Sequence, residues 1–252
     1  MRIIFLLTLL LASICPQNQT KKQTQTLQYK QHSFDIYRVD INQQKIELFL
    51  KDSLQQKFGS IDAVKKQVEK QGKELVFATN AGMYLPHKNN DPQGLYIEKG
   101  VEHNPLNVGD TSAMLNFYMK PNGVFLGTPS SVKVIETSKY EAIAQTDSIV
   151  FATQSGPMLL IDGQIHPKFR EFSKNIHIRS GVGIIDDTNL VFAISNERVN
   201  FYTFAMLFKE VLHCNNALYL DGAISEMYIP SLPRKQLGGN FGAIIGICAP
   251  NK

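Results

Sequence analysis

The sequence predicts an α+β protein: a single domain of mixed, mostly antiparallel sheets with two or three helices and two loosely repeated halves. Short apolar segments bounded by Gly, Pro, Asn and Asp outnumber helical patterns between residues 30 and 252, which favours this class. No Pro-, Gly- or Ser-rich stretch divides that region. The run at 76–83 (VFATNAGM) recurs at 150–158 (VFATQSGPM), and a stretch typical of a hairpin follows each copy. Such internal similarity indicates two related halves.

The expected elements follow from apolar periodicity and turn residues. Ser60 suits a helix N-cap, and Asn200 suits another. Around the sequence KPNG at 120–123 we expect two strands joined by a turn. Along the chain the predicted elements are strands 34–39 and 45–50 (a hairpin or an adjacent pair), helix 61–71, strand 74–79, strands 115–119 and 124–126, strands 132–135 and 148–153, a hairpin of 181–185 with 190–195, helix 201–212, strand 217–220 and strand 242–249.

The composition is that of an ordinary globular protein. Hydrophobic residues make up 43% of the 252 residues, charged residues make up 19%, and the formal net charge is +4. No dense Lys/Arg run with interleaved aromatic residues occurs, so nucleic-acid binding is not expected. No spacing of His, Cys, Asp and Glu resembles a metal site, and we expect neither a metal nor another cofactor.

The N-terminus has the features of an export signal. Arg2 precedes an apolar run at 3–12, which is too short to span a bilayer. Residues 12–15 (ASIC) resemble a bacterial lipoprotein cleavage box, although Ile14 departs from its usual small residue. We therefore expect a signal peptide at 1–15, a flexible Gln/Thr/Lys-rich tether at 16–30 and one domain at 31–252. The expected location is periplasmic or anchored in the outer membrane, with membrane contact only through a lipid on Cys15.

Two further cysteines lie in apolar surroundings. Cys214 follows residues 211–213 (VLH), and Cys248 follows 244–247 (IIGI). An exported protein could join them in a disulfide. The apolar context favours two small buried hydrophobic residues instead.

Four polar, glycine-bearing loops lie at the ends of apolar segments. They are 80–84 (NAGMY), 154–157 (QSGP), 179–183 (RSGVG) and 221–226 (DGAISE). Each alone is typical of a turn, in which Asn, Asp or Ser bonds its own backbone. Four such loops on the strands of one core favour a site, because glycine admits a ligand close to the backbone and arginine matches a phosphate or carboxylate.

These loops resemble, in the same order, the motifs of the phosphodiester glycosidase family, which includes the lysosomal uncovering enzyme of animals and many exported bacterial proteins. The similarity covers residues 34–247. It implies hydrolysis of a sugar-1-phosphodiester to a free sugar and a phosphomonoester. Ala223 stands where animal members have a second glycine. The site residues carried over by the resemblance are Asn80, Gly82, Ser155, Gly156, Arg179, Asp221, Gly222 and Ser225.

The chemistry of glycosidic cleavage assigns roles to these residues. Glycosidases ordinarily use two carboxyl groups, but a phosphodiester leaving group needs less protonation. We expect Asp221 to act as nucleophile or base and Arg179 to hold the phosphate. Asn80 and Ser155 would orient sugar or water. Glu226 is the candidate second carboxyl, and Tyr84 is a further candidate binding residue.

Two alternatives are compatible with the same residues. The first is a non-catalytic envelope protein that binds a glycan or an anionic ligand, which would keep Arg179 and not require Asp221. The second is a serine hydrolase using Ser155, which lacks a Gly-x-Ser-x-Gly elbow and a placed His partner.

Overall fold

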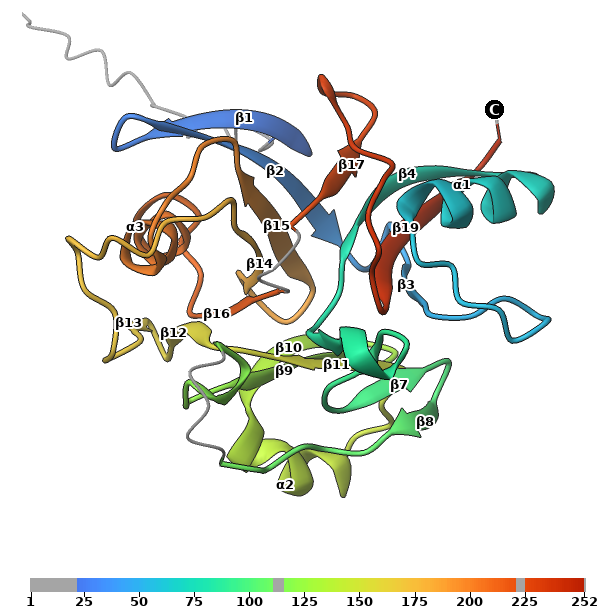
Figure 1. The fold of residues 1–252 in the computed structure, drawn as a ribbon, viewed down its shortest axis with the longest axis horizontal. Coiled ribbons are helices and arrows are strands. Elements are labelled where there is room, and N and C mark those ends of the chain that lie inside the picture. The colour runs from blue at the N-terminus through green and yellow to red at the C-terminus, as the bar shows by residue number, and fades with distance from the viewer. Residues whose placement is uncertain (1–21, 111–115, 221–224, 252) are drawn as a thin grey trace, which may run out of the picture.

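Three antiparallel sheets form the frame of the molecule (Figure 1). The computed structural model describes them over residues 22–110, 116–220 and 225–251. Three α-helices accompany the sheets in these ranges, as the α+β prediction requires. No helix in the same ranges is long and apolar enough to cross a membrane.

The largest sheet has seven strands and carries the N-terminal strand at one edge. In spatial order its strands are β1 (Thr24–Tyr29), β2 (His32–Asp40), β15 (Asn189–Ser195), β14 (Ser180–Ile184), β16 (Asn216–Tyr219), β12 (Met158–Ile161) and β13 (Gln164–Ile165). The β14–β15 hairpin forms as predicted, with Ser180 paired to Ile194.

Two five-stranded sheets hold the repeated runs, and each run supplies the central strand of its sheet. One sheet has the order β18 (Arg234–Lys235), β17 (Met227–Ile229), β4 (Lys73–Asn80), β19 (Ile244–Pro250) and β3 (Ile46–Phe49). The other has the order β10 (Val132–Glu136), β9 (Gly123–Gly127), β11 (Phe151–Ser155), β7 (Tyr96–Glu98) and β8 (Val101–Asn104). A small pair, β5 (Tyr84–Leu85) and β6 (Asp91–Pro92), follows the first run.

The predicted hairpin after each run is present. The β7–β8 turn places Lys99 and Gly100 at φ 53° and 79°, and the β12–β13 turn places Asp162 and Gly163 at φ 46° and 76°. Paired positive φ values are typical of two-residue hairpin turns.

The helices begin at their predicted caps. Ser60 Oγ accepts from Ala63 N at 3.2 Å, and Asn200 Oδ1 accepts from Thr203 N at 2.8 Å. The helical elements are α1 (Ile61–Lys70), α2 (Tyr140–Ala144), α3 (Phe201–Met206) continuing as a π-helix (Leu207–Val211), and 3₁₀ turns at Pro86–Lys88, Asn116–Tyr118 and Thr137–Lys139.

A chain of aromatic rings joins the three sheets. Phe77 of the first run lies 4.4 Å from Tyr37 and 4.8 Å from Phe192, between ring centroids. Phe192 lies 6.0 Å from Phe125, which in turn lies 5.2 Å from Phe151 of the second run. Both runs therefore contribute to one central core, which fixes their relative position.

The structure corrects the pairing expected for the first two strands. β2 lies in the seven-stranded sheet, whereas β3 pairs with β19 in a different sheet. The two strands are therefore neither a hairpin nor neighbours. Alternating apolar residues suit any adjacent strand, so local pattern cannot choose between partners far apart in sequence.

The expected tether is also wrong for residues 24–29. These residues form β1, which pairs in register with β2 across a turn at Lys30 and Gln31, with φ 48° and 65°. Lys-Gln lacks the Asn and Gly that usually mark such a turn. The strand is held because Leu27 and Tyr29 pack on the buried cluster beneath α3.

The strand predicted at 115–119 is absent where the structure describes it. Asn116–Tyr118 is a 3₁₀ turn with Phe117 fully buried, and β9 pairs with β10 and β11 instead. Asn122 Nδ2 donates to Phe117 O at 2.9 Å and holds this loop in place. Cys214 and Cys248 are not joined by a disulfide: Cys214 is buried as expected, and Cys248 is half-buried.

Candidate active site

A buried polar cluster forms where the first run ends. Asn80, at the end of β4, is 1% exposed. Its Oδ1 accepts from Ser180 Oγ at 3.1 Å and from the backbone N of Glu226 at 3.2 Å. Its Nδ2 is buried and has no hydrogen-bond partner among the described residues. A buried amide nitrogen without an acceptor is costly, so this donor is available to a ligand.

Three distant parts of the chain meet in this cluster. Ser180 begins β14, and its Oγ also lies 3.2 Å from Ser225 Oγ. The segment before β17 is anchored to β4 because Thr79 Oγ1 donates to Glu226 O at 2.9 Å and Met227 pairs with Thr79. Sheet pairing therefore delivers Ser225 and Glu226 to the end of β4.

Glu226 has a carboxyl group in a partly buried position. Its Oε2 is buried without a hydrogen-bond partner among the described residues. A Cβ added at Gly238 would lie 3.5 and 3.6 Å from the two carboxyl oxygens, so this glycine forms an adjacent wall. Burial raises the pKa of Glu226 above its ordinary value. A carboxyl group in this condition can hold a proton at higher pH than an exposed one.

Arg179 is fully buried and largely occupied by structural bonds. Its Nε donates to Val199 O at 2.9 Å, and its Nη2 donates to Asn175 O and Oδ1 at 3.0 and 2.8 Å. Its Nη1 is buried and makes no hydrogen bond within 3.5 Å among the described residues. Tyr219 is a further polar neighbour of the guanidinium, with its ring centroid 5.3 Å from Arg179 Cζ. No carboxylate in those residues forms an ion pair with it. A buried cation in such a place calls for an anion.

A column of stacked rings supports the guanidinium. Arg179 Cζ lies 3.6 Å from the Phe201 ring centroid, and Phe201 stacks on Phe169 at 4.9 Å with an interplanar angle of 6°. His166 stacks on Phe169 at 4.7 Å. Burial, with help from nearby Lys168, lowers the pKa of His166 to about 4, so its ring is neutral near pH 7. The stacked rings fix the plane of the guanidinium. Because His166 is neutral, Arg179 is the only charged member of the column.

The loop after the first run packs directly on the second run. Gly82 N donates to Thr153 Oγ1 at 3.0 Å, and a Cβ at Gly82 would lie 2.1 Å from Gln154 O. Only glycine fits this approach. The two runs therefore meet near their ends.

The loop of the second run is buried and tightly packed. Ser155 is 0% exposed, and its Oγ has no hydrogen-bond partner among the described residues. A Cβ at Gly156 would lie 2.7 Å from Asn122 Cβ. Within the described ranges, the hydrogen bonds of the Asn80 side chain involve neither Ser155 nor Gly156. Tyr84 begins β5, pairs with Pro92 and is half-buried.

Of the predicted site residues, Asn80 bonds the backbone of Glu226 directly and is linked to Ser225 through Ser180. Arg179 precedes Ser180 in the chain, and no contact among the described residues places its guanidinium against this cluster. Asp221 and Gly222 lie outside the described residues. In the ranges that are described, no group of three or more His, Cys, Asp or Glu side chains could hold a metal ion.

Comparison with known proteins identifies the family of the chain. Residues 73–241, from β4 to the segment before β19, match the model of the phosphodiester glycosidase family. The chain belongs to the phosphodiester glycosidase family. The matched region contains the Asn80 cluster, Arg179 and both repeated runs.

One curated bacterial protein is similar in sequence, and solved structures from zebrafish and bacteria are similar in fold. The uncharacterized protein YigE of Escherichia coli (strain K12) is 34% identical over 193 residues, covering 77% of this chain and 73% of YigE. The catalytic domain of zebrafish N-acetylglucosamine-1-phosphodiester alpha-N-acetylglucosaminidase, auto-inhibited by its pro-peptide, has a similar fold. It has a TM-score of 0.59 at 15% identity, and the match covers 89% of this chain and 81% of that one. A putative exported protein from Burkholderia pseudomallei K96243 matches at TM-score 0.50 and 10% identity, covering 86% of this chain and 74% of that one.

Sequence reasoning missed two supporting residues of the site. Ser180 lies inside the RSGVG motif but was not assigned a role, and Thr79 lies inside the first run. The Ser180 hydroxyl bonds Asn80, 100 residues away in the chain, and the Thr79 hydroxyl bonds Glu226, 147 residues away. Small hydroxyl residues at strand ends are common, so only the tertiary contact marks them.

Proposed function

We propose that this phosphodiester glycosidase family member hydrolyses a sugar-1-phosphodiester, releasing the sugar and a phosphomonoester. The observation that carries the proposal is the Asn80 cluster, in which the Asn80 Nδ2 donor and the Glu226 Oε2 acceptor are both buried and unpartnered among the described residues. Buried polar atoms are ordinarily bonded. Two unbonded atoms on residues that are joined by the hydrogen bond from Glu226 N to Asn80 Oδ1 therefore support a bound ligand rich in hydroxyl and oxyanion groups.

Arg179 is suited to the phosphate because its guanidinium is desolvated and held rigidly. Two of its nitrogens are committed to Val199 and Asn175, while Nη1 is not. In a low-dielectric site, a fixed cation stabilises negative charge more strongly than in water. Negative charge grows on the bridging oxygen as the glycosidic bond breaks, so Arg179 favours the transition state.

The carboxyl groups supply the proton transfers. In the proposed reaction the anomeric C–O bond to phosphate breaks, water oxygen bonds the anomeric carbon, and the proton of that water passes to a carboxylate. Asp221 is proposed as that base, or as a nucleophile that forms and then releases a glycosyl ester. Glu226, whose pKa is raised by burial, is proposed to carry the proton for the leaving oxygen. Asn80 Nδ2 would orient a sugar hydroxyl or the water.

Release of sugar from a synthetic sugar-1-phosphate diester tests the proposal. Wild type is expected to turn the diester over, and Asp221→Asn is expected to be slower by about 1,000-fold or more, since a carboxylate essential to the reaction is lost. Asp187→Asn, in the exposed β14–β15 turn, is the matched control and is expected to act as wild type. Equal rates for wild type and Asp221→Asn would remove Asp221 from the mechanism.

A second experiment separates a hydrolase from a binding protein. Calorimetric titration with a sugar phosphate, under conditions in which turnover would be seen, distinguishes them. Binding heat without product in the wild type would show a glycan- or anion-binding protein and contradict the proposal.

We further propose that the substrate belongs to an envelope or extracellular glycan. The export features of residues 1–15 support this location, and Cys15 would be the point of lipid attachment. Both lie outside the described residues. Labelling of the expressed protein with a fatty acid, compared with Cys15→Ser, tests the lipid, and an unlabelled wild type would contradict it.

A further inference from the structure

A groove opens between the two five-stranded sheets, away from the Asn80 cluster. It consists of two adjoining cavities of about 680 and about 660 Å³. Both are lined by Glu47 of β3 and by Glu98 and Lys99 of the β7–β8 hairpin, so they form one continuous groove. No residue of the Asn80 cluster lines either cavity. The size of each cavity falls in the range of small-molecule sites.

The first cavity combines ring surfaces with amide side chains. Phe49 and Phe58 lie with ring centroids 6.1 Å apart at an interplanar angle of 85°, and both are only partly buried. Gln55, Gln67 and Gln71 line the same cavity, and no hydrogen bond of their side chains is found among the described residues. Exposed ring faces stack on the C–H faces of sugars, and amides bond hydroxyl groups in both directions.

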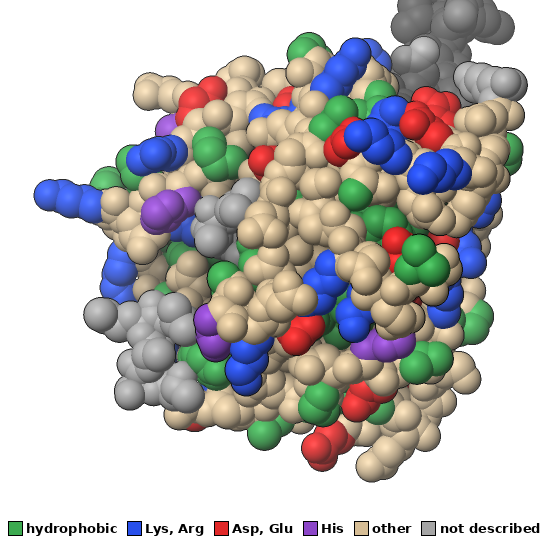
Figure 2. Space-filling model, turned by 45° about the vertical axis from the view of Figure 1, so that its right-hand side comes forward, with side chains coloured by type: hydrophobic (Ala, Val, Ile, Leu, Met, Phe, Trp, Pro, Cys, Tyr) green, Lys and Arg blue, Asp and Glu red, His purple; other side chains and the backbone are tan. Residues whose placement is uncertain are grey.

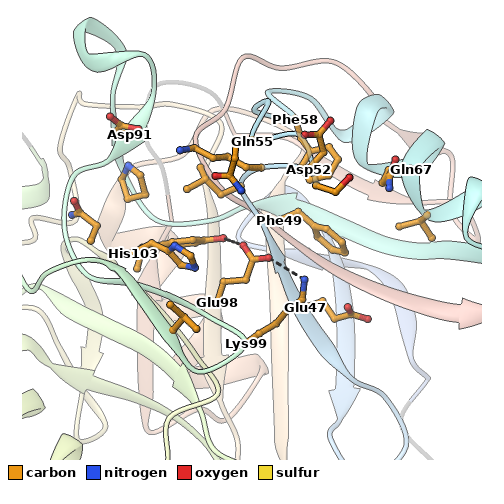
Figure 3. Close-up of a pocket in the computed structure, with 18 of the residues that line it drawn as sticks. Glu47, Phe49, Asp52, Gln55, Phe58, Gln67, Asp91, Glu98, Lys99 and His103 are labelled. Atoms are coloured by element: carbon orange, nitrogen blue, oxygen red, sulfur yellow. Dashed lines mark hydrogen bonds and ion pairs between the residues drawn. The ribbon is translucent and has the colours of Figure 1, made fainter.

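Glu98 occupies the junction of the two cavities in a fixed position. Figure 3 shows it between His103 and Phe49. The fully buried Tyr96 donates its hydroxyl to Glu98 Oε2 at 2.7 Å. The other oxygen lies 3.4 Å from Lys99 Nζ, whose side chain is 78% exposed, so this ion pair is weak. A pair of neighbouring hydroxyl groups can replace Lys99 at that oxygen.

The charges in the first cavity are mostly compensated. Asp91 pairs with Lys57 at 2.6 Å, and Asp52 Oδ1 accepts from two backbone N–H groups of its own loop. Four carboxylates line this cavity against two lysines, so it does not favour an anion. Acidic and basic side chains are interspersed on the face in Figure 2 rather than gathered by sign. The groove therefore suits an uncharged polar ligand and differs from the proposed phosphate site.

A peptide strand fits the groove less well. β3 and β8 are edge strands and could in principle pair with an added strand. Each has only four residues, and the β7–β8 register shifts between Tyr96 and Ile97. Short edges and bulges discourage strand addition. We propose that this groove binds an uncharged oligosaccharide chain, with ring units in both cavities and Glu98 bonding a pair of hydroxyl groups.

The test is calorimetric titration of the full chain with cellotetraose, chitotetraose and maltotetraose. At least one tetrasaccharide is expected to bind wild type, with affinity weakened about tenfold or more by Glu98→Gln and by Phe58→Ala. Glu98→Gln keeps the shape of the side chain, and Phe58→Ala is accepted as informative if its melting curve remains cooperative. Glu102→Gln, an exposed neighbour on β8 that lines neither cavity, is the matched control and should bind as wild type.

Two results would overturn the proposal. The first is no binding of any tetrasaccharide at concentrations up to about 10 mM. The second is binding that Glu98→Gln leaves unchanged. If Asn80→Ala weakens that binding instead, the sugar lies in the candidate active site. Because Asp221→Asn should abolish diester hydrolysis and leave tetrasaccharide binding intact, failure of one proposal is distinguishable from failure of the other.

Discussion

Asn80 and Gln154 occupy the same position in the two copies of the run, yet their side chains differ in how completely they are hydrogen-bonded. Gln154 Oε1 accepts from Leu95 N and Asn107 N, both at 2.9 Å, and its Nε2 donates to Asn107 O at 2.8 Å. Every polar atom of that amide is bonded inside the protein. Asn80 uses its oxygen in the same way but leaves Nδ2 unbonded among the described residues.

The difference comes from the surroundings of two equivalent strand ends. The longer Gln154 reaches the backbone of the segment around Asn107 and holds it against β7. Asn80 is shorter and faces a meeting point of separate sheets, where only its oxygen finds partners. A repeated strand end can therefore become a structural clamp in one half and a binding position in the other.

The largest expected effect is on activity when Asn80 is changed. Asn80→Ala removes the unbonded donor, and the rate of diester hydrolysis should fall by about 100–1,000-fold, as for loss of one oriented donor in an active site. The free energy of unfolding should fall by only about 1–2 kcal/mol, for the lost bonds to Ser180 and Glu226. Kinetics at a temperature where the variant is folded measure the first quantity, and chemical denaturation measures the second. Unchanged kinetics would contradict a binding role for Asn80.

Gln154→Ala should show the reverse balance. It leaves the N–H groups of Leu95 and Asn107 without acceptors, at a cost of about 3 kcal/mol. The melting temperature should therefore fall by about 6–12 °C. Gln145→Ala, at an exposed position after α2, is the control and should melt like wild type. A melting temperature for Gln154→Ala equal to that of Gln145→Ala would contradict the clamp.

The smallest expected effect is a pH-dependent change in stability caused by Glu226, whose backbone bonds Asn80. Burial raises the pKa of Glu226, so the folded state favours the protonated acid and loses stability as pH rises above the ordinary glutamate range. Glu226→Gln should melt like wild type near pH 4. Near pH 7 it should be more stable than wild type, because glutamine carries no charge to keep desolvated. Thermal melts of both proteins across that pH range measure the difference. A pH-independent difference would show that ionisation of Glu226 does not destabilise the folded state.

Local pattern was sufficient for the elements that are bounded by clear cap or turn residues. The caps at Ser60 and Asn200, the β14–β15 hairpin and the hairpins after both runs all depend on neighbouring residues, and the structure has them where the sequence predicts them. Local pattern failed for β1, which closes through an unmarked Lys-Gln turn, and for 116–118, whose apolar residues are buried in a 3₁₀ turn. In both cases packing against distant residues decides the conformation.

The sequence by itself determined the α+β class, the repeat, the family and the loops from which a site would be built, because each is written in residues close together in the chain. Only the tertiary structure decided that the two runs lie at the centres of separate sheets, that Asn80 meets Ser180 and Glu226, and that Gln154 is occupied. Strand pairing and side-chain contacts across 100 or more residues depend on how well whole surfaces pack. The two runs have nearly the same sequence, and their different neighbours make one strand end a structural clamp and the other a candidate binding position.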